Sequence, residues 1–101
     1  MSNTFSKEAR VETDIEDEAS VAEILRALRR YLPEEEEASL QSWLCEYLSK
    51  QINEGSLGFY IDEFGAKDVV EISAQEALEM LAEREVWNAE HDVMLHPFYI
   101  D

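Results

Sequence analysis

The chain of 101 residues contains one cysteine, three glycines and two prolines. A single cysteine excludes an internal disulfide, and nothing flanking Cys45 activates a nucleophile, so it is expected to be a small, partly buried apolar residue. The three glycines do not form the closely spaced group of a phosphate-cradling loop. These shortages exclude the motifs by which most nucleotide-binding and thiol enzymes are recognised.

Positive charge is scarce as well. Eight Lys and Arg stand against 24 Asp and Glu, which gives a formal net charge of −16. This charge repels nucleic acid and anionic membranes, so a charged partner is expected to be basic. No apolar run approaches the ~20 residues of a membrane-spanning helix, and the start MSNTFSKEAR has no apolar signal-peptide core. We therefore expect a cytoplasmic protein.

The histidines and carboxylates form no metal-binding or catalytic pattern of useful specificity. His91 has nothing better than an asparagine three or four positions away, and Asp92 and His96 stand where Pro97 is expected to end a helix. The stretch DEFG, residues 62–65, differs from the metal-binding DFG of protein kinases by an inserted residue, in a chain too short for that fold. The sequence predicts no enzyme, no cofactor and no metal site, and surface or cap positions for the histidines.

The apolar residues, 46% of the chain, suffice for the core of one ordinary domain. Residues 1–19 mix charges without a clear period and are interpreted as a polar acidic N-terminal segment. Residues 20–101 are expected to form a single compact domain. The predicted fold class is α+β, with the element order helix, helix, β-hairpin, helix.

Capping patterns and periodicity place the helices. Ser20 and Glu23 form a capping box that opens the first helix, and the second is expected to begin at Pro33 and to end near Gly55, a left-handed cap. The apolar stripe of the first helix comprises Val21, Ile24, Leu25, Leu28, Tyr31 and Leu32, and that of the second comprises Leu40, Trp43, Leu44, Tyr47, Leu48 and Ile52, all expected in the core.

A change of period from 3.6 to 2 predicts a β-hairpin, residues 57–62 paired with residues 68–72. Ser73 then opens a third helix that is expected to reach about Leu95. This helix should kink or break near Arg84–Glu85, because a continuous helix would place the Glu85 carboxylate in its apolar face. The apolar end, residues 98–100, is expected to dock on the domain.

Four consecutive glutamates, Glu34–Glu37, exceed what the start of a helix requires. One or two acids in a first turn are explained by the helix dipole, whereas four repel one another. The surplus is either a surface that a partner binds or a solvated surface that nothing binds. The first helix alone is basic, and its Arg26, Arg29 and Arg30 are expected to pair with the acidic N-terminal segment or to contact a partner.

A second acidic group is expected on the third helix, where Glu76, Glu79, Glu83 and Glu90 share a sector if the kink is small, with Trp87 at its edge. Such an acidic stripe with an aromatic margin is typical of a protein-binding surface. The alternative for Trp87 is packing under the C-terminal segment. The candidate partner-binding residues are Glu34, Glu35, Glu36, Glu37, Glu76, Glu79, Glu83, Trp87 and Glu90.

In size, charge and helix-plus-hairpin layout the sequence resembles the small acidic inhibitors encoded by phages, especially anti-CRISPR proteins that bind the basic DNA-binding surfaces of effector complexes. The resemblance concerns overall character and carries no residue assignment. It implies a non-enzymatic inhibitor that acts in the host cytoplasm. The protein would occupy a nucleic-acid groove of a CRISPR surveillance complex and prevent target DNA from reaching the guide.

Two other classes fit the same features. An immunity protein or antitoxin would neutralise a basic nuclease toxin by similar charge complementarity. A secretion chaperone or assembly subunit would need a large apolar face left over after folding. The expected partner is a basic nucleic-acid-binding protein or complex, and direct binding of nucleic acid or membrane is not expected. A monomer is favoured, whereas a secretion chaperone should dimerise.

Overall fold

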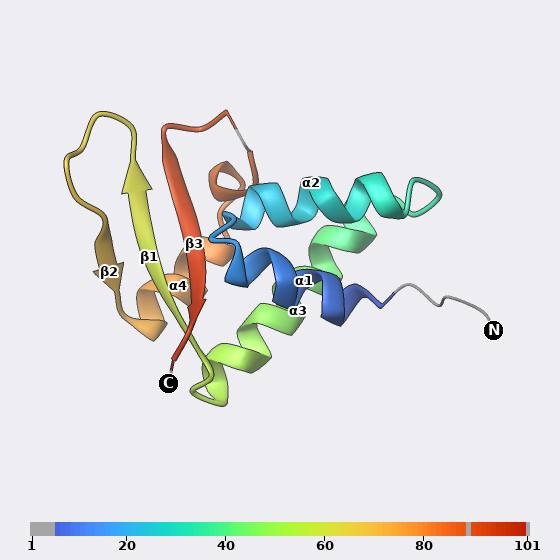
Figure 1. Ribbon diagram of the computed structural model, residues 1–101, viewed down its shortest axis with the longest axis horizontal. Coiled ribbons are helices and arrows are strands. Elements are labelled where there is room, and N and C mark those ends of the chain that lie inside the picture. The colour runs from blue at the N-terminus through green and yellow to red at the C-terminus, as the bar shows by residue number, and fades with distance from the viewer. Residues whose placement is uncertain (1–5, 89, 101) are drawn as a thin grey trace.

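Figure 1 shows the computed structural model, which describes residues 6–88 and 90–100. The architecture is α+β, with helices packed against a three-stranded antiparallel sheet, as the fold class predicts. The order of elements differs from the predicted one because the described chain has an additional first helix and a C-terminal strand. The elements are α1 (Lys7–Glu16), α2 (Val21–Tyr31), α3 (Glu37–Asn53), β1 (Leu57–Glu63), β2 (Val70–Ile72), α4 (Ala74–Leu81), a 3-10 turn η1 (Glu85–Trp87) and β3 (Val93–Tyr99).

The predicted β-hairpin is confirmed. β1 pairs antiparallel with β2, with Phe59 opposite Ile72, and the turn contains Gly65 at a φ of 88°. β1 also pairs antiparallel with β3, with Phe59 opposite Pro97, so β1 is the central strand. Pro97 lacks a backbone N–H, and its place on an edge strand is one of the few that a sheet tolerates.

The helices cover the sheet and enclose a single core. α1 and α2 contact β3, whereas α3 and α4 contact β1. The central apolar side chains of both predicted helical stripes are buried, but Tyr31 is exposed, and Trp43 and Tyr47 are only half-buried. The core contains Val11, Ile15, Val21, Ile24, Leu25, Leu28, Leu40, Leu44, Leu48, Ile52, Leu57, Phe59, Ala77, Leu81, Val86, Trp87 and Leu95.

The N-terminal segment, interpreted as a polar tail, contains the helix α1. The Ser6 hydroxyl caps it by accepting the N–H of Ala9, and Val11 and Ile15 enter the core. The sequence pattern was obscured because the apolar face also carries Asp14, which is buried. Glu18, at a φ of 63°, ends α1 and turns the chain into α2, so a single helix through both segments is impossible.

The helix termini were predicted with mixed success. The capping box of Ser20 and Glu23 is present, and Gly55 follows α3 at a φ of 77°, as expected for a left-handed cap. The prediction that the second helix begins at Pro33 is wrong. Residues 33–35 form a turn, closed by a hydrogen bond from Glu35 N to Leu32 O, and α3 begins only at Glu37.

The predicted break near Arg84–Glu85 is present, since α4 ends at Leu81 and η1 follows as a separate turn. The predicted continuation of the helix to Leu95 is wrong. Val93–Tyr99 is instead the strand β3, which brings the C-terminal segment onto β1. The expected docking of this segment is therefore confirmed, through backbone pairing that a local pattern does not reveal.

The two histidines also differ from one another. His91 is half-buried in the turn before β3, and its Nδ1 accepts the N–H of Val93 at 3.0 Å. His96 is buried in β3, stacks on Tyr60 with ring centroids 4.8 Å apart, and donates from Nδ1 to Glu18 O at 2.9 Å. The expected surface position is wrong for His96, because the ring ties β3 to the turn between α1 and α2.

No helix among the described residues combines the length and the apolar character that crossing a membrane requires.

Candidate functional site

The acidic side chains lie almost entirely on the surface. Among the Asp and Glu residues that the structure describes, Asp14 is buried and every other one is exposed. Asp14 is held by Arg10, whose Nη2 and Nε donate to the two carboxylate oxygens at 2.6 and 3.3 Å. Among the described acidic residues, one carboxylate is thus buried, and the others lie on the surface.

The first predicted site, Glu34–Glu37, forms the turn between α2 and α3 and is exposed. Glu36 is the N-cap of α3 but makes no side-chain capping bond. Glu35 and Glu37 already have ion-pair partners, Lys7 at 3.3 Å and Arg29 at 3.4 Å. Glu34 and Glu36 have no ion pair with a described residue, so about half of this charge is free.

The arginines of α2 do not pair with the N-terminal segment. Arg29 pairs with Glu37, while Arg26 and Arg30 make no ion pair with any described residue. The N-terminal Arg10 pairs instead within its own helix and lies over the ring of Tyr31, 5.1 Å from its centroid.

The second predicted site is not one helical stripe. Glu76 and Glu79 are exposed on α4, but Glu83 follows the end of this helix and Glu90 lies in the turn before β3. Trp87 is buried in the core, and its Nε1 donates to Leu81 O at 3.1 Å. Placing Trp87 at the edge of an acidic helix was wrong because α4 ends six residues earlier.

The two predicted acidic groups lie far from each other. In Figure 1 the turn that carries Glu34–Glu37 is at one end of the long axis, whereas α4 lies toward the other end, near the hairpin. The molecule measures 46 Å along this axis. The structure therefore does not bring the two groups into one surface.

A different acidic row lies on α1. Glu8, Glu12 and Glu16 are exposed at i, i+4 and i+8, so they follow one face of the helix with a rise of about 6 Å per step. The ion pair between Lys7 and Glu35 places the start of α1 beside the turn that carries Glu34–Glu37. The acidic row thus extends from that turn along α1.

Half-buried aromatic rings of α3 border this row. Trp43 and Tyr47 are stacked, with ring centroids 5.3 Å apart and ring planes at 16°. Lys7 Nζ lies 5.3 Å from the centroid of Trp43, which joins the N-terminus of α1 to the aromatic pair. Partial burial raises the pKa of Tyr47, and the neighbouring carboxylates of Glu12 and Glu8 raise it further. The acids of α1 therefore act electrostatically on the aromatic side chains next to them.

Tyr99, at the end of β3, continues the aromatic border. Its side chain is 38% exposed. Partial burial raises the pKa of Tyr99 to about 12, with further contributions from Tyr47, Glu12 and Glu16. We call the set Glu8, Glu12, Glu16, Trp43, Tyr47 and Tyr99 the α1 stripe.

The α1 stripe has the composition that was expected of the third helix, an acidic row with an aromatic margin, on a segment that had been interpreted as a tail. A signal was available. The spacing of Val11 and Ile15 is helical, and the glutamates at positions 8, 12 and 16 repeat every four residues. The contribution of Tyr99 depends on the pairing of β3 with β1, which no local pattern indicates.

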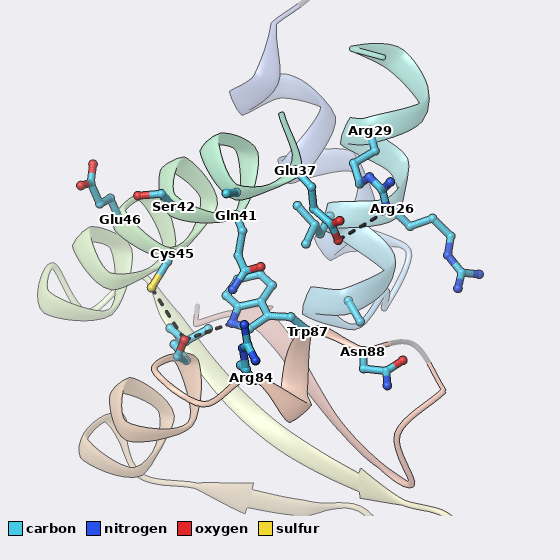
Figure 2. Close-up of a pocket in the computed structure, with 14 residues that line it drawn as sticks. Arg26, Arg29, Glu37, Gln41, Ser42, Cys45, Glu46, Arg84, Trp87 and Asn88 are labelled. Atoms are coloured by element: carbon cyan, nitrogen blue, oxygen red, sulfur yellow. Dashed lines mark hydrogen bonds and ion pairs between the residues drawn. The ribbon is translucent and has the colours of Figure 1, made fainter. Parts of the chain in front are cut away.

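A cleft of about 790 Å3 lies between α2, α3 and the segment after α4, and is shown in Figure 2. Its walls carry opposite charges, which include Arg29 with its partner Glu37, Arg84 and Glu46. Figure 2 shows that the side chain of Arg26 extends away from Glu37. The cleft is thus lined by both signs of charge and does not resemble the acidic surface.

Cys45 lies in the wall of this cleft without a base beside it. Its Sγ donates weakly to Leu81 O at 3.9 Å, the same carbonyl that accepts the indole N–H of Trp87, and both contacts are drawn in Figure 2. Neither histidine lines the cleft. Cys45 is half-buried, as expected, and its side chain contacts the end of α4 from α3.

The described residues contain no group of three or more His, Cys, Asp or Glu side chains placed to hold a metal ion. No family model, curated protein or solved structure matches the chain.

Proposed function

We propose that the protein is a non-enzymatic acidic inhibitor that binds a basic nucleic-acid-binding surface of another protein and blocks access of DNA or RNA. The favoured target is a CRISPR surveillance complex in a host cytoplasm, which makes the protein an anti-CRISPR inhibitor. The observation that carries the proposal is the α1 stripe, in which three exposed carboxylates at one-turn spacing border a half-buried aromatic row.

Electrostatics supports a basic partner. Nearly all of the acidic side chains described are on the surface, whereas Lys7, Arg10 and Arg29 are engaged in internal ion pairs. The resulting negative field steers the protein toward grooves lined by Lys and Arg and away from nucleic acid itself. A groove that holds phosphates presents regularly spaced positive charge, and the carboxylates of α1 offer a regular negative row to it.

The aromatic border supports a protein partner over a diffuse ionic contact. Charge alone gives encounter rate and specificity, whereas affinity at protein interfaces comes largely from central aromatic and arginine side chains. Trp43 and Tyr47 lie one turn apart on α3 and stack on each other, so they lose little side-chain entropy on binding. The stripe thus combines attraction at long range with an apolar contact at short range.

The experiment is a competition assay with purified CRISPR surveillance complexes and a labelled target DNA. The protein should prevent DNA binding to its target complex, and the variant Glu8→Gln/Glu12→Gln/Glu16→Gln should inhibit at least tenfold less well, because each lost charge pair at a partly desolvated interface contributes about 1 kcal/mol. A basic nuclease toxin assayed in parallel tests the immunity-protein class.

A matched variant, Glu76→Gln/Glu79→Gln/Glu83→Gln, removes the same charge from the surface first predicted from the sequence. If this variant loses inhibition and the α1 variant does not, the binding surface lies around α4 and the assignment to the α1 stripe is wrong. Absence of inhibition of every complex and toxin by the unaltered protein, at low and at physiological salt, would refute the proposal itself.

A further inference from the structure

The hairpin of β1 and β2 has an open strand edge. β2 is the outermost strand of the sheet, since the strand order is β2-β1-β3. In Figure 1 no other described segment lies beyond it. The backbone N–H and C=O groups on its outer side are therefore available to a further strand.

Large apolar side chains collect at this edge. Phe64 in the hairpin turn is 87% exposed, and Val69 and Val70 are 55% and 60% exposed. Val70 lies opposite Ile61 on the face of the sheet that carries Phe59, but the helices do not cover it. The edge thus offers both unpaired backbone groups and apolar contacts, the two components of strand addition.

The turn that carries Phe64 is held in place. Phe64 N donates to Asp92 O at 2.8 Å, which ties the turn to the segment before β3. Between them lies a hollow of about 400 Å3 whose walls include the carboxylates of Asp62, Glu63, Glu90 and Asp92. This hollow lies on the β3 side of the hairpin, across β1 from the outer edge of β2.

Charge determines which occupant fits. Asp68 and Glu71 flank Val69 and Val70, and Lys67 is the one basic residue of the hairpin. A second copy pairing edge to edge would place these acids against one another, which is unfavourable. We propose that β2 accepts an extended segment of a partner protein, with alternating apolar and Lys or Arg side chains, as a fourth strand of the sheet.

This inference goes beyond the proposed function, because the edge lies on β2, whereas the α1 stripe lies on α1, α3 and the end of β3, and the two are altered by different variants. The apolar side chains of the added strand contact Val70 and Phe64. Its basic side chains face Glu71, on the opposite face of the strand from Val70.

The test titrates the isotope-labelled protein with a synthetic peptide of alternating Lys and Val, using a peptide of alternating Glu and Val as the charge control. NMR should show shifts and slowed amide exchange at residues 69–72 with the basic peptide alone, weakened by added salt. Val70→Lys should weaken this binding about tenfold, while Ile100→Lys, the same change at an exposed apolar residue elsewhere, should not alter it.

Circular dichroism checks that both lysine variants are folded. The variant Asp68→Asn/Glu71→Gln provides a second test, because it removes negative charge and leaves the apolar side chains unchanged. This double variant should flatten the salt dependence. The inference is overturned if no shift appears at residues 69–72, if the acidic peptide binds equally well, or if sedimentation shows that the unaltered protein dimerises and Val70→Lys is monomeric, which would assign the edge to a second copy.

Discussion

At the scale of single residues, buried or crowded side chains determine how the surface elements are held. Asp14 is 5% exposed and depends on Arg10, which itself reaches solvent. Gly58 lies directly beneath the ring of Phe98, and Tyr99 has a raised pKa. Each of these residues lies in a segment that is in contact with the rest of the protein.

The pair of Arg10 and Asp14 predicts an asymmetry. Arg10→Ala leaves a buried carboxylate without a partner, whereas Asp14→Ala leaves a guanidinium that can be hydrated. Arg10→Ala should therefore lower the midpoint of thermal unfolding more than Asp14→Ala does. The reverse order, measured at pH 7 in the same buffer, would show that the carboxylate is hydrated and that α1 is docked less tightly.

Gly58 is required by a close approach. A Cβ at this position would stand 2.5 Å from Cζ of Phe98, so Gly58→Ala must displace the ring. Because Phe98 is only half-buried and can move outward, the cost should be about 1 kcal/mol of unfolding free energy, at the lower end for overpacking. In the Phe98→Ala background the same change should be neutral or stabilising. Urea denaturation of the four proteins tests this, and equal penalties in both backgrounds would contradict it.

Tyr99 predicts a loss of stability in alkali. Its hydroxyl has a pKa of about 12 in the folded protein and about 10 in an unfolded chain. Between pH 10 and pH 12 the unfolded state releases the Tyr99 proton more readily than the folded state does. The contribution of Tyr99 to stability is therefore complete below pH 10 and is lost as the pH rises toward 12. Tyr99→Phe should flatten the decline in unfolding midpoint between pH 9 and 11.5. If the decline is unchanged in Tyr99→Phe, the loss of stability in alkali is due to titratable groups other than Tyr99.

At the scale of elements, local signals predicted well and distant pairings did not. The helix start at Ser20, the end near Gly55 and the hairpin all depend on residues close in sequence, and all are present. β3 was missed because its partner β1 is about 35 residues away and Val93 to Leu95 also fits a helical stripe. The start of α3 was misplaced because Pro33 suits either a first helical position or a turn.

α1 was missed for a different reason. Its apolar face contains only Val11 and Ile15, with the buried Asp14 between them. A carboxylate that is satisfied by an ion pair looks polar in sequence and behaves as part of the core. The ion pair with Arg10, four residues earlier in the same helix, makes this possible. The candidate surface was missed with it, because the acidic row can be placed only once α1 is recognised as a docked helix.

The docking of α1 gives a prediction at this scale. Ile15 is 3% exposed in the core, so Ile15→Ala should lower the free energy of unfolding by about 2–5 kcal/mol. Thr13→Ala on the exposed side of the same helix should change it by less than about 0.5 kcal/mol. If the two variants unfold at the same urea concentration, the N-terminal segment behaves as a tail and the α1 stripe does not exist as a fixed surface.

At the scale of the whole molecule, only part of the net charge of −16 is available to a partner, because some acidic side chains are held in internal ion pairs. Internal ion pairs hold Glu35, Glu37 and Asp14, while the row on α1 and the acids of the hairpin are exposed on separate elements. A protein of this shape can make two separate contacts with a large basic partner. The composition predicts that a charged partner is basic, but only the fold indicates which surface of this protein the partner would contact.

The measurement that tests the central claim most directly is the salt dependence of association with the purified target complex. It is made for the unaltered protein and for the two matched triple variants. We expect Glu8→Gln/Glu12→Gln/Glu16→Gln to lower the association rate and to flatten its dependence on salt, because attraction by the α1 stripe is screened over about 10 Å at 0.1 M salt. Glu76→Gln/Glu79→Gln/Glu83→Gln should retain most of the slope. Identical slopes for the unaltered protein and the α1 variant would contradict the account.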